Sequence, residues 1–154
     1  MELIGKTSIN PFLFYSGKIA GYIIWIAFIF SLFQGNLKES LIITSLALVI
    51  FFPGLIISFL SILDLGKSTR LGLPIKKTSL KTNGLYNISR NPMYVGFNLM
   101  TIASVFFTLN WIISILGIYS ILIYHMIILA EENFLSSRFD EDYINYTKKV
   151  RRYI

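Results

Sequence analysis

The sequence contains no cysteine and a single histidine, His125. Disulfide bonds and thiolate chemistry are therefore excluded, and so is a metal site built from several histidines, so we predict no metal site. The chain also lacks the pattern G-x-G-x-x-G and any alternating strand pattern that would carry it, which argues against a dinucleotide-binding sheet. No basic stretch with an A-x-A-like cleavage site opens the sequence, so we expect no cleavable signal peptide.

Charged residues are absent from long stretches of the chain. Hydrophobic residues make up 55% of the 154 residues and charged ones 14%, and the mean hydropathy is +0.66. Residues 41–63 carry no charge. As a helix rising ~1.5 Å per residue they are roughly 35 Å long, enough to cross a bilayer. The sequence therefore predicts one domain over residues 1–154, and this domain is an integral membrane protein.

Four apolar segments are predicted to span the membrane, which makes the expected fold all-α. The first lies in residues 12–33, the second in 41–63, and the third and fourth form a hairpin over 93–130 that turns near Asn110. The third has only about 17 residues, the lower limit for a full crossing. Pro53 and Gly54 are expected to kink or unwind the second. Lys18, near the start of the first, is expected to reach the interface by snorkelling.

Positive charge is concentrated on one side of these segments. Six basic residues lie between Asp64 and Pro92, and four more lie within residues 148–152. The short loop 35–40 carries only Lys38 and Glu39. Because Lys and Arg mark cytoplasmic loops, both termini of this multi-pass protein are predicted to be cytoplasmic. The same charges favour anionic lipid over nucleic acid as a partner.

After position 130 the sequence becomes amphipathic. Apolar residues recur with the spacing of one helical face, which predicts a cytoplasmic amphipathic C-terminal helix: Leu135, Phe139, Tyr143, Tyr146 and Val150. Glu131 lies four residues before Leu135 and therefore on the apolar face, whereas Glu132 points about 100° away. We therefore predict that Glu131 faces inward and that Glu132 is an ordinary interfacial carboxylate.

Four motifs in order point to a known family. Residues 80–86 read L-K-T-N-G-L-Y, residues 89–96 read S-R-N-P-M-Y-V-G, residues 131–135 read E-E-N-F-L, and the amphipathic stripe follows. Separated by one hairpin, they resemble the isoprenylcysteine carboxyl methyltransferase and phospholipid methyltransferase superfamily. These are integral membrane enzymes that use S-adenosylmethionine. The resemblance covers roughly residues 71–154, the expected donor-binding core, and residues 1–64 supply two N-terminal spans.

The resemblance implies a donor site and assigns these residues to it: Thr78, Ser79, Leu80, Lys81, Tyr86, Asn91, Pro92, Met93, Tyr94 and Glu131. The residue types suit the ligand, because a carboxylate accepts hydrogen bonds from ribose hydroxyls and tyrosine rings pack on an adenine or a sulfonium. Arg90 and Glu131 are the predicted catalytic residues. Arg90 would orient an anionic acceptor or the donor carboxylate through a bidentate contact.

Two positions depart from the family pattern. Asn91 stands where the family often has histidine, and Ile127 stands where the isoprenylcysteine enzymes carry a substrate-contacting arginine. The predicted function is therefore methyl transfer to a lipid or lipidated acceptor, with the prenylcysteine acceptor in doubt. The alternatives are a membrane-embedded NADPH-dependent reductase of the lipid or steroid type and a non-enzymatic membrane subunit. His125 is expected to be hydrogen-bonded inside the bundle.

Overall fold

The computed structural model describes residues 7–34, 41–66 and 79–154. Within these ranges it contains four α-helices, α1 (Pro11–Phe33), α2 (Leu41–Leu65), α3 (Pro92–Thr108) and α4 (Trp111–Lys149), and one short 3-10 helix, η2 (Gly84–Asn87). Three helices, α1, α2 and α4, are long and apolar enough to cross a membrane, and α3 is a shorter apolar helix. The described ranges contain no strand beyond one isolated bridge. The predicted all-α membrane architecture is confirmed.

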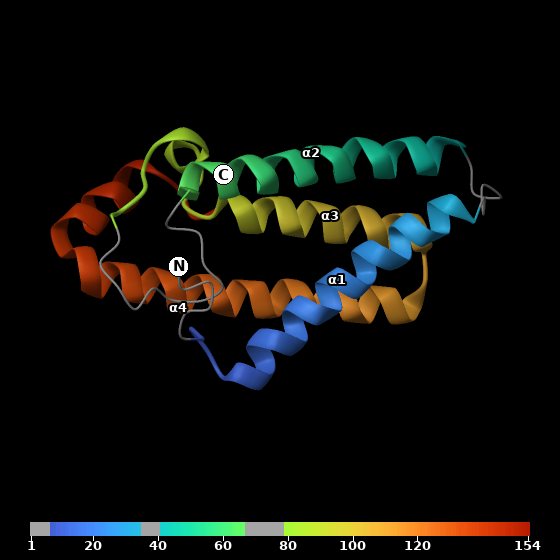
Figure 1. The fold of residues 1–154 in the computed structure, drawn as a ribbon, viewed down its shortest axis with the longest axis horizontal. Helices are drawn as coiled ribbons and strands as arrows, with labels where there is room; N and C mark the ends of the chain where they lie inside the picture. Colours follow the sequence, from blue (N-terminus) through green and yellow to red (C-terminus); the bar gives the residue numbers. More distant parts are fainter. Residues whose placement is uncertain (1–6, 35–40, 67–78) are drawn as a thin grey trace.

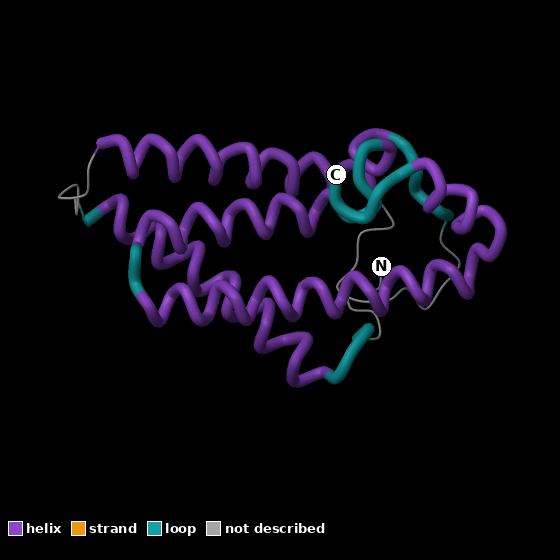
Figure 2. Tube along the Cα trace, turned by 180° about the vertical axis from the view of Figure 1, so that it is seen from behind, coloured by secondary structure: helices purple, strands orange, loops and turns teal. Residues whose placement is uncertain are grey.

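The helices pack as a bundle in which each runs opposite to the next. Figure 1 shows α2 and α3 side by side along their length, with α4 below them and α1 crossing α4 obliquely. The view from behind shows the same arrangement (Figure 2). The most extensive contacts are those between α2 and α3, followed by those between α1 and α4. As a result, the starts of α1 and α3 and the end of α2 lie at the same end of the bundle (Figure 1).

Asparagine and proline residues set the helix boundaries. The Asn10 side chain accepts a hydrogen bond from the Phe12 N–H at 2.9 Å, and Pro11 occupies the first helical position of α1. Asn110 likewise accepts from the N–H of Ile112 at 2.9 Å and caps α4. Leu109, with φ 44°, ends α3 in the left-handed region. The hairpin turn predicted near Asn110 is therefore confirmed.

Small residues bring α2 and α3 into close contact. A Cβ on Gly96 of α3 would lie 2.4 Å from the Gly54 carbonyl oxygen of α2 and 2.2 Å from Ser58 Oγ. α2 continues through Pro53 as one helix, so the unwinding expected there was wrong. Proline is tolerated in such a helix because neighbouring groups compensate for its missing N–H.

A second pair of glycines fixes α1 on α4. A Cβ on Gly17 would lie 2.3 Å from Ile123 Cγ2, and one on Gly21 would lie 3.0 Å from Ser120 Oγ. The Ser120 hydroxyl also donates a hydrogen bond to the Gly17 carbonyl oxygen at 3.0 Å. The register of α1 along α4 is therefore set by direct backbone approach.

Helix α4 is longer than a membrane crossing requires. Residues 111–130 contain no Asp, Glu, Lys or Arg and are ~30 Å long as a helix, which suffices for one crossing. Beyond them the helix continues, and at Asp140 (φ 41°, ψ −116°) the chain leaves helical geometry. The following segment turns back toward the start of α3 (Figure 1). The predicted apolar stripe is confirmed as a packed cluster, joined by Leu80: Leu135, Phe139, Tyr143, Tyr146 and Val150.

Candidate functional site

Most of the polar residues singled out from the sequence meet at one end of the bundle. We call this region the polar end and define it as residues 79–94, Glu131 and Glu132 of α4, and residues 143–153. The returning C-terminal segment pairs there with the residues before α3, through a parallel bridge between Ser89 and Arg151. The Arg90 N–H donates to the Arg151 carbonyl oxygen at 2.9 Å. Three stretches far apart in the sequence thus form one structure.

Glu132 is the centre of a charged cluster at the polar end. Arg90 donates to it from two nitrogens, Nε to Oε1 at 3.0 Å and Nη2 to Oε2 at 3.2 Å. Asn91 Nδ2 donates to Oε1 at 3.0 Å, and Arg152 Nε donates to Oε2 at 2.9 Å. The Glu132 side chain is only 10% exposed, so these contacts satisfy a buried charge.

Arg90 links this cluster to the end of α4. Its Nη1 donates to the carbonyl oxygens of Val150 at 3.1 Å and Thr147 at 3.5 Å. Carbonyls at a helix C-terminus lack intrahelical partners and carry partial negative charge, so a guanidinium is well suited to them. One side chain therefore joins the residues before α3, Glu132 and the last turn of α4.

Ser89 and Asn91 flank Arg90 and are both buried. Ser89 Oγ accepts from the Asn91 N–H at 3.2 Å and donates to the Arg152 carbonyl oxygen at 3.3 Å. Asn91 Nδ2 donates to the same carbonyl oxygen at 3.2 Å. The polar residues around Arg90 thus hold the returning C-terminal segment against the start of α3.

The C-terminal segment is tethered at one further point. His125 Nδ1 lies 2.6 Å from the Tyr153 hydroxyl, and the two rings are stacked with centroids 6.2 Å apart. The expectation that His125 is hydrogen-bonded inside the bundle is confirmed. Its partner is a tyrosine that the returning chain brings to α4.

Glu131 has a different environment from its neighbour. The Tyr94 hydroxyl, on a side chain that is 3% exposed, donates to Glu131 Oε1 at 3.0 Å. Among the described residues no donor contacts the second oxygen, Oε2. Within the described ranges Glu131 therefore has one oxygen without a protein donor, whereas both oxygens of Glu132 accept hydrogen bonds from the protein.

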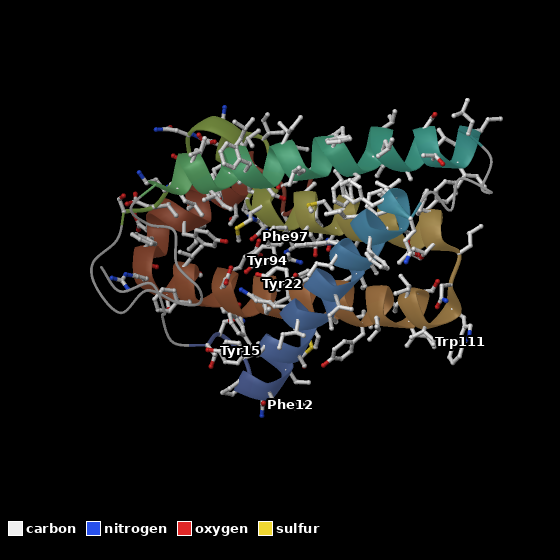
Figure 3. The ribbon with its side chains drawn as sticks, turned by 45° about the vertical axis from the view of Figure 1, so that its right-hand side comes forward. Phe12, Tyr15, Tyr22, Tyr94, Phe97 and Trp111 are labelled. Carbon is white, nitrogen blue, oxygen red and sulfur yellow. The ribbon has the colours of Figure 1, made fainter. Side chains whose placement is uncertain are left out.

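Aromatic rings lead from this carboxylate into the bundle. Tyr94 packs against Phe97 and Tyr124, with centroids 6.1 Å and 5.7 Å away. Phe97 in turn packs on Trp25 of α1 at 5.1 Å. Figure 3 shows Tyr22, Tyr94 and Phe97 gathered where α1, α3 and α4 meet. A series of packed rings thus extends from Tyr94, which contacts Glu131, to Trp25 of α1.

The 3-10 helix η2 fixes the segment that carries Tyr86. Asp64, at the end of α2, accepts from the Leu85 N–H at 2.9 Å. Gly84 has φ +64°, and a Cβ there would lie 2.2 Å from Asp64 Oδ2, so this turn requires glycine. The Tyr86 carbonyl oxygen accepts a short hydrogen bond from the Tyr146 hydroxyl. Burial raises the pKa of Tyr86 above its ordinary value, so the phenol remains a donor.

The chain matches the family model described as phospholipid methyltransferase over residues 42–142. This chain belongs to the phospholipid methyltransferase family. The match begins at the second residue of α2, covers α3 and continues in α4 to residue 142. It therefore includes four residues of the polar end, Arg90, Asn91, Tyr94 and Glu131. No curated protein matches the methyltransferase in a sequence search.

The methyltransferase brings only part of the predicted donor set together. Asn91, Tyr94, Glu131 and Tyr86 all lie at the polar end, where Asn91 donates to Glu132 and Tyr94 donates to Glu131. The Tyr86 carbonyl group accepts from Tyr146. Pro92 begins α3, and the Met93 carbonyl oxygen accepts from Ser58 Oγ at 3.4 Å. Leu80 packs on the C-terminal stripe. Of its two neighbours in the sequence, Ser79 is exposed and Lys81 is half-buried. Thr78 lies outside the described residues.

Three expectations about individual side chains were wrong or incomplete. Glu132 is not an ordinary interfacial carboxylate, because the returning C-terminal segment and Arg90 enclose it. The bidentate contact expected between Arg90 and an anionic ligand is made with Glu132. Lys18 does not snorkel to water: it is 8% exposed and lies over the Phe14 ring. Arg152 was missed, since in sequence it is one of several basic residues after position 147.

Proposed function

We propose that this methyltransferase uses S-adenosylmethionine and transfers its methyl group to a lipid or lipidated acceptor at the polar end. The observation that supports this most directly is the Glu131–Tyr94 pair. It lies in the segment matched by the family model, and no described residue donates to the second oxygen of this carboxylate.

The residues present fit such a donor. Glu131 Oε2 can accept a hydrogen bond from a ribose hydroxyl, and Tyr94 and Phe97 offer ring faces. We assign the carboxylate of the amino-acid portion to the backbone N–H groups of Ser79, Leu80 and Lys81, for which no described residue is an acceptor. S-adenosylmethionine would supply an electrophilic methyl group on a sulfonium. The protein's part is to hold and align it, and Glu131 and the backbone of residues 79–81 would do so.

Side chains around Glu132 and η2 would also exclude water from this site. Arg90, Asn91 and Arg152 close the cluster around Glu132, and Tyr86 and Tyr146 join η2 to the C-terminal segment. A water-poor environment strengthens the charge contacts of the donor and protects an electrophilic methyl group from hydrolysis. We therefore assign Arg90 a positioning role, in which it holds the C-terminal segment against the residues before α3.

The acceptor would come from the bilayer. The exposed basic residues near the polar end include Lys148, Lys149 and Arg151, which suit anionic headgroups. Their number supports a cytoplasmic location for this end. An acceptor whose tail remains among the apolar helices could present its head group there. This geometry favours a lipid over a fully water-soluble acceptor.

Binding to purified protein in lipid nanodiscs tests the donor. We expect saturable binding of S-adenosylmethionine by calorimetry, weakened about tenfold or more in Glu131→Gln, because a neutral amide is a weaker acceptor for two hydroxyls. Glu141→Gln is the matched control, since Glu141 is an exposed carboxylate on the same helix.

The same preparation separates the alternatives. Tight NADPH binding without S-adenosylmethionine binding would favour the reductase, and binding of neither would favour a non-enzymatic subunit. Transfer of radiolabelled methyl groups to extracted lipids, lost in Glu131→Gln and kept in Glu141→Gln, would support the proposed reaction. An unaffected Glu131→Gln variant would contradict the assigned donor site.

A further inference from the structure

A groove between α3 and α4 is not used by the site described so far. Its volume is about 780 Å³, and it extends along both helices as far as Leu109 and Trp111 at the hairpin turn. Figure 3 shows Trp111 at the end of the bundle away from Tyr94. Ile118, on the wall of the groove, is 62% exposed. The groove is therefore open to the acyl chains of a bilayer.

The groove residues of α3 form one stripe that leads to a polar side chain. Ile102, Val105 and Leu109 line the groove and are spaced by three and four residues, which is one face of a helix. Asn98 lies four residues before Ile102. It is therefore on the same face, one turn nearer the polar end.

Helix α4 carries a matching stripe. Ser114, Ile118 and Ile121 line the groove and are spaced by four and three residues. His125 lies four residues after Ile121. It continues this face of α4 by one turn, again toward the polar end.

The packing of the hairpin places Asn98 and His125 at one level. A Cβ on Gly117 would lie 2.6 Å from Val105 Cγ2, so these two residues are opposite each other. From there, at ~1.5 Å per residue, Asn98 is roughly 11 Å and His125 roughly 12 Å nearer the polar end. The apolar groove thus leads to two polar residues, one on each helix.

The carboxamide of Asn98 lacks a partner. Its Oδ1 atom is buried, and no described residue donates to it. Asn98 as a whole is only half-buried, and its terminal torsion is soft, so the amide can turn toward a ligand in the groove. An unpaired amide at this depth is costly, because the bilayer core holds no water to satisfy it. Polar residues of this kind mark functional sites in membrane proteins.

His125 is the second polar group at this level. Its Nδ1 lies 2.6 Å from the Tyr153 hydroxyl, which is its one hydrogen-bond partner within the described ranges. Nε2 therefore has no partner there, and a histidine ring nitrogen donates or accepts according to its tautomer.

We infer that this groove holds the acyl chain of the lipid acceptor, and that Asn98 and His125 bind an N–H or O–H group where the chain joins the head group. From Asn98 to Leu109 the stripe is roughly 16 Å long, which suits a long chain better than a short one. Tyr94, whose hydroxyl donates to Glu131, lies one turn before Asn98, so the head group would extend toward the donor site. The inference rests on the proposed function in one respect, namely that the lipid bound here is the methyl acceptor.

Photo-cross-linking in nanodiscs of dioleoyl phosphatidylcholine tests the role of Asn98 without any methyl donor. Two probes carry a diazirine at the end of the same palmitoyl chain, one as the 2-methoxyethyl amide and the other as the ester, so they differ in a single N–H. We expect the amide to label groove peptides about threefold to tenfold more than the ester, as for one hydrogen bond. Asn98→Leu, with Asn98→Ala as a second neutral variant, should abolish this preference and leave labelling by the ester unchanged. A preserved preference in both variants would overturn the role of Asn98.

Two pairs of variants test the groove and His125. Ile118→Trp should lower labelling by both probes severalfold, because the larger ring fills the groove. The matched control is Ile112→Trp, since Ile112 is 50% exposed on the same helix and does not line the groove. His125→Phe should also lower labelling, whereas Tyr153→Phe, which removes only the protein partner, should not. Equal labelling of Ile118→Trp and Ile112→Trp would place the probe outside the groove and refute the inference.

Competition tests whether the bound lipid is the acceptor. The amide probe should inhibit transfer of radiolabelled methyl groups to extracted lipids in the wild type, and less so in Ile118→Trp. Specific labelling of the groove without inhibition would show that its lipid is not the acceptor. Absence of methyl transfer from the wild type would refute the proposed function, and the cross-linking result would still decide whether the groove binds a chain.

Discussion

Removal of the Glu132 charge is the most severe test of how the polar end is held together. Glu132→Gln leaves Arg90 and Arg152 close to each other with no carboxylate between them. The amide also turns an NH2 group toward donors, so at least one of the four hydrogen bonds to the carboxylate is lost. We therefore expect the C-terminal segment to separate from the residues before α3.

The expected loss of unfolding free energy depends on how exposed each charged side chain of the cluster is. Arg90 and Glu132 side chains are 12% and 10% exposed, whereas that of Arg152 is 38% exposed. Breaking a buried pair from one side costs about 3–5 kcal/mol, and an exposed pair contributes about 0–1 kcal/mol. Glu132→Gln and Arg90→Met should therefore lower the free energy of unfolding by about 3 kcal/mol each. Arg152→Met should lower it by about 1 kcal/mol.

Reversible unfolding in bicelles measures this free energy, with Lys149→Met as the exposed control. Glu131→Gln is the informative neighbour, because glutamine still accepts from Tyr94 and should cost about 1 kcal/mol or less. The two adjacent carboxylates are then expected to have different roles: Glu132 mainly determines stability, and Glu131 mainly determines donor binding. The reasoning fails if Arg152→Met destabilises as much as Arg90→Met, or if Glu132→Gln unfolds like the Lys149→Met control.

Two further predictions concern the backbone. Gly96→Ala should destabilise the α2–α3 contact by about 1–3 kcal/mol in thermal unfolding, because its Cβ meets both Ser58 and Gly54. Ser58→Ala should not rescue it, since the Gly54 carbonyl oxygen remains 2.4 Å from that position, and full rescue would show that the hydroxyl alone was responsible. Asp140→Gly should raise stability by about 1 kcal/mol, because φ 41° is strained for a residue with a Cβ. A less stable Asp140→Gly variant in the same assay would mean that the aspartate side chain itself holds the turn.

The helices could be predicted from the sequence because membrane segments depend on local composition. The first two apolar segments were predicted over residues 12–33 and 41–63, and the helices observed are Pro11–Phe33 and Leu41–Leu65. The turn near Asn110 could be predicted because asparagine is a common helix N-cap, the role it has here. The apolar stripe after Leu135 was likewise a local pattern. These elements can be predicted without knowing which residues distant in the sequence pack against them.

The environment of each carboxylate could not be predicted in this way. A helical wheel places Glu132 away from the apolar face, and that rotation is correct for a straight helix. Its burial depends on Arg90, 42 residues earlier, and on Arg152, which reaches it only because the chain turns at Asp140. Lys18 was misjudged for a related reason, because the snorkelling rule takes no account of the close α1–α4 contact beside it.

The turn at Asp140 also has a consequence for biosynthesis. Residues 150–152 follow all four apolar helices in the chain, and they complete the cluster around Glu132. Helices in a membrane insert first and associate afterwards. The cluster of Arg90, Glu132 and Arg152 therefore forms during association, after the helices have inserted. The polar end closes only in a late step, on a bundle that is already inserted, so a substitution at Arg152 should affect maturation of the site more than insertion of the helices.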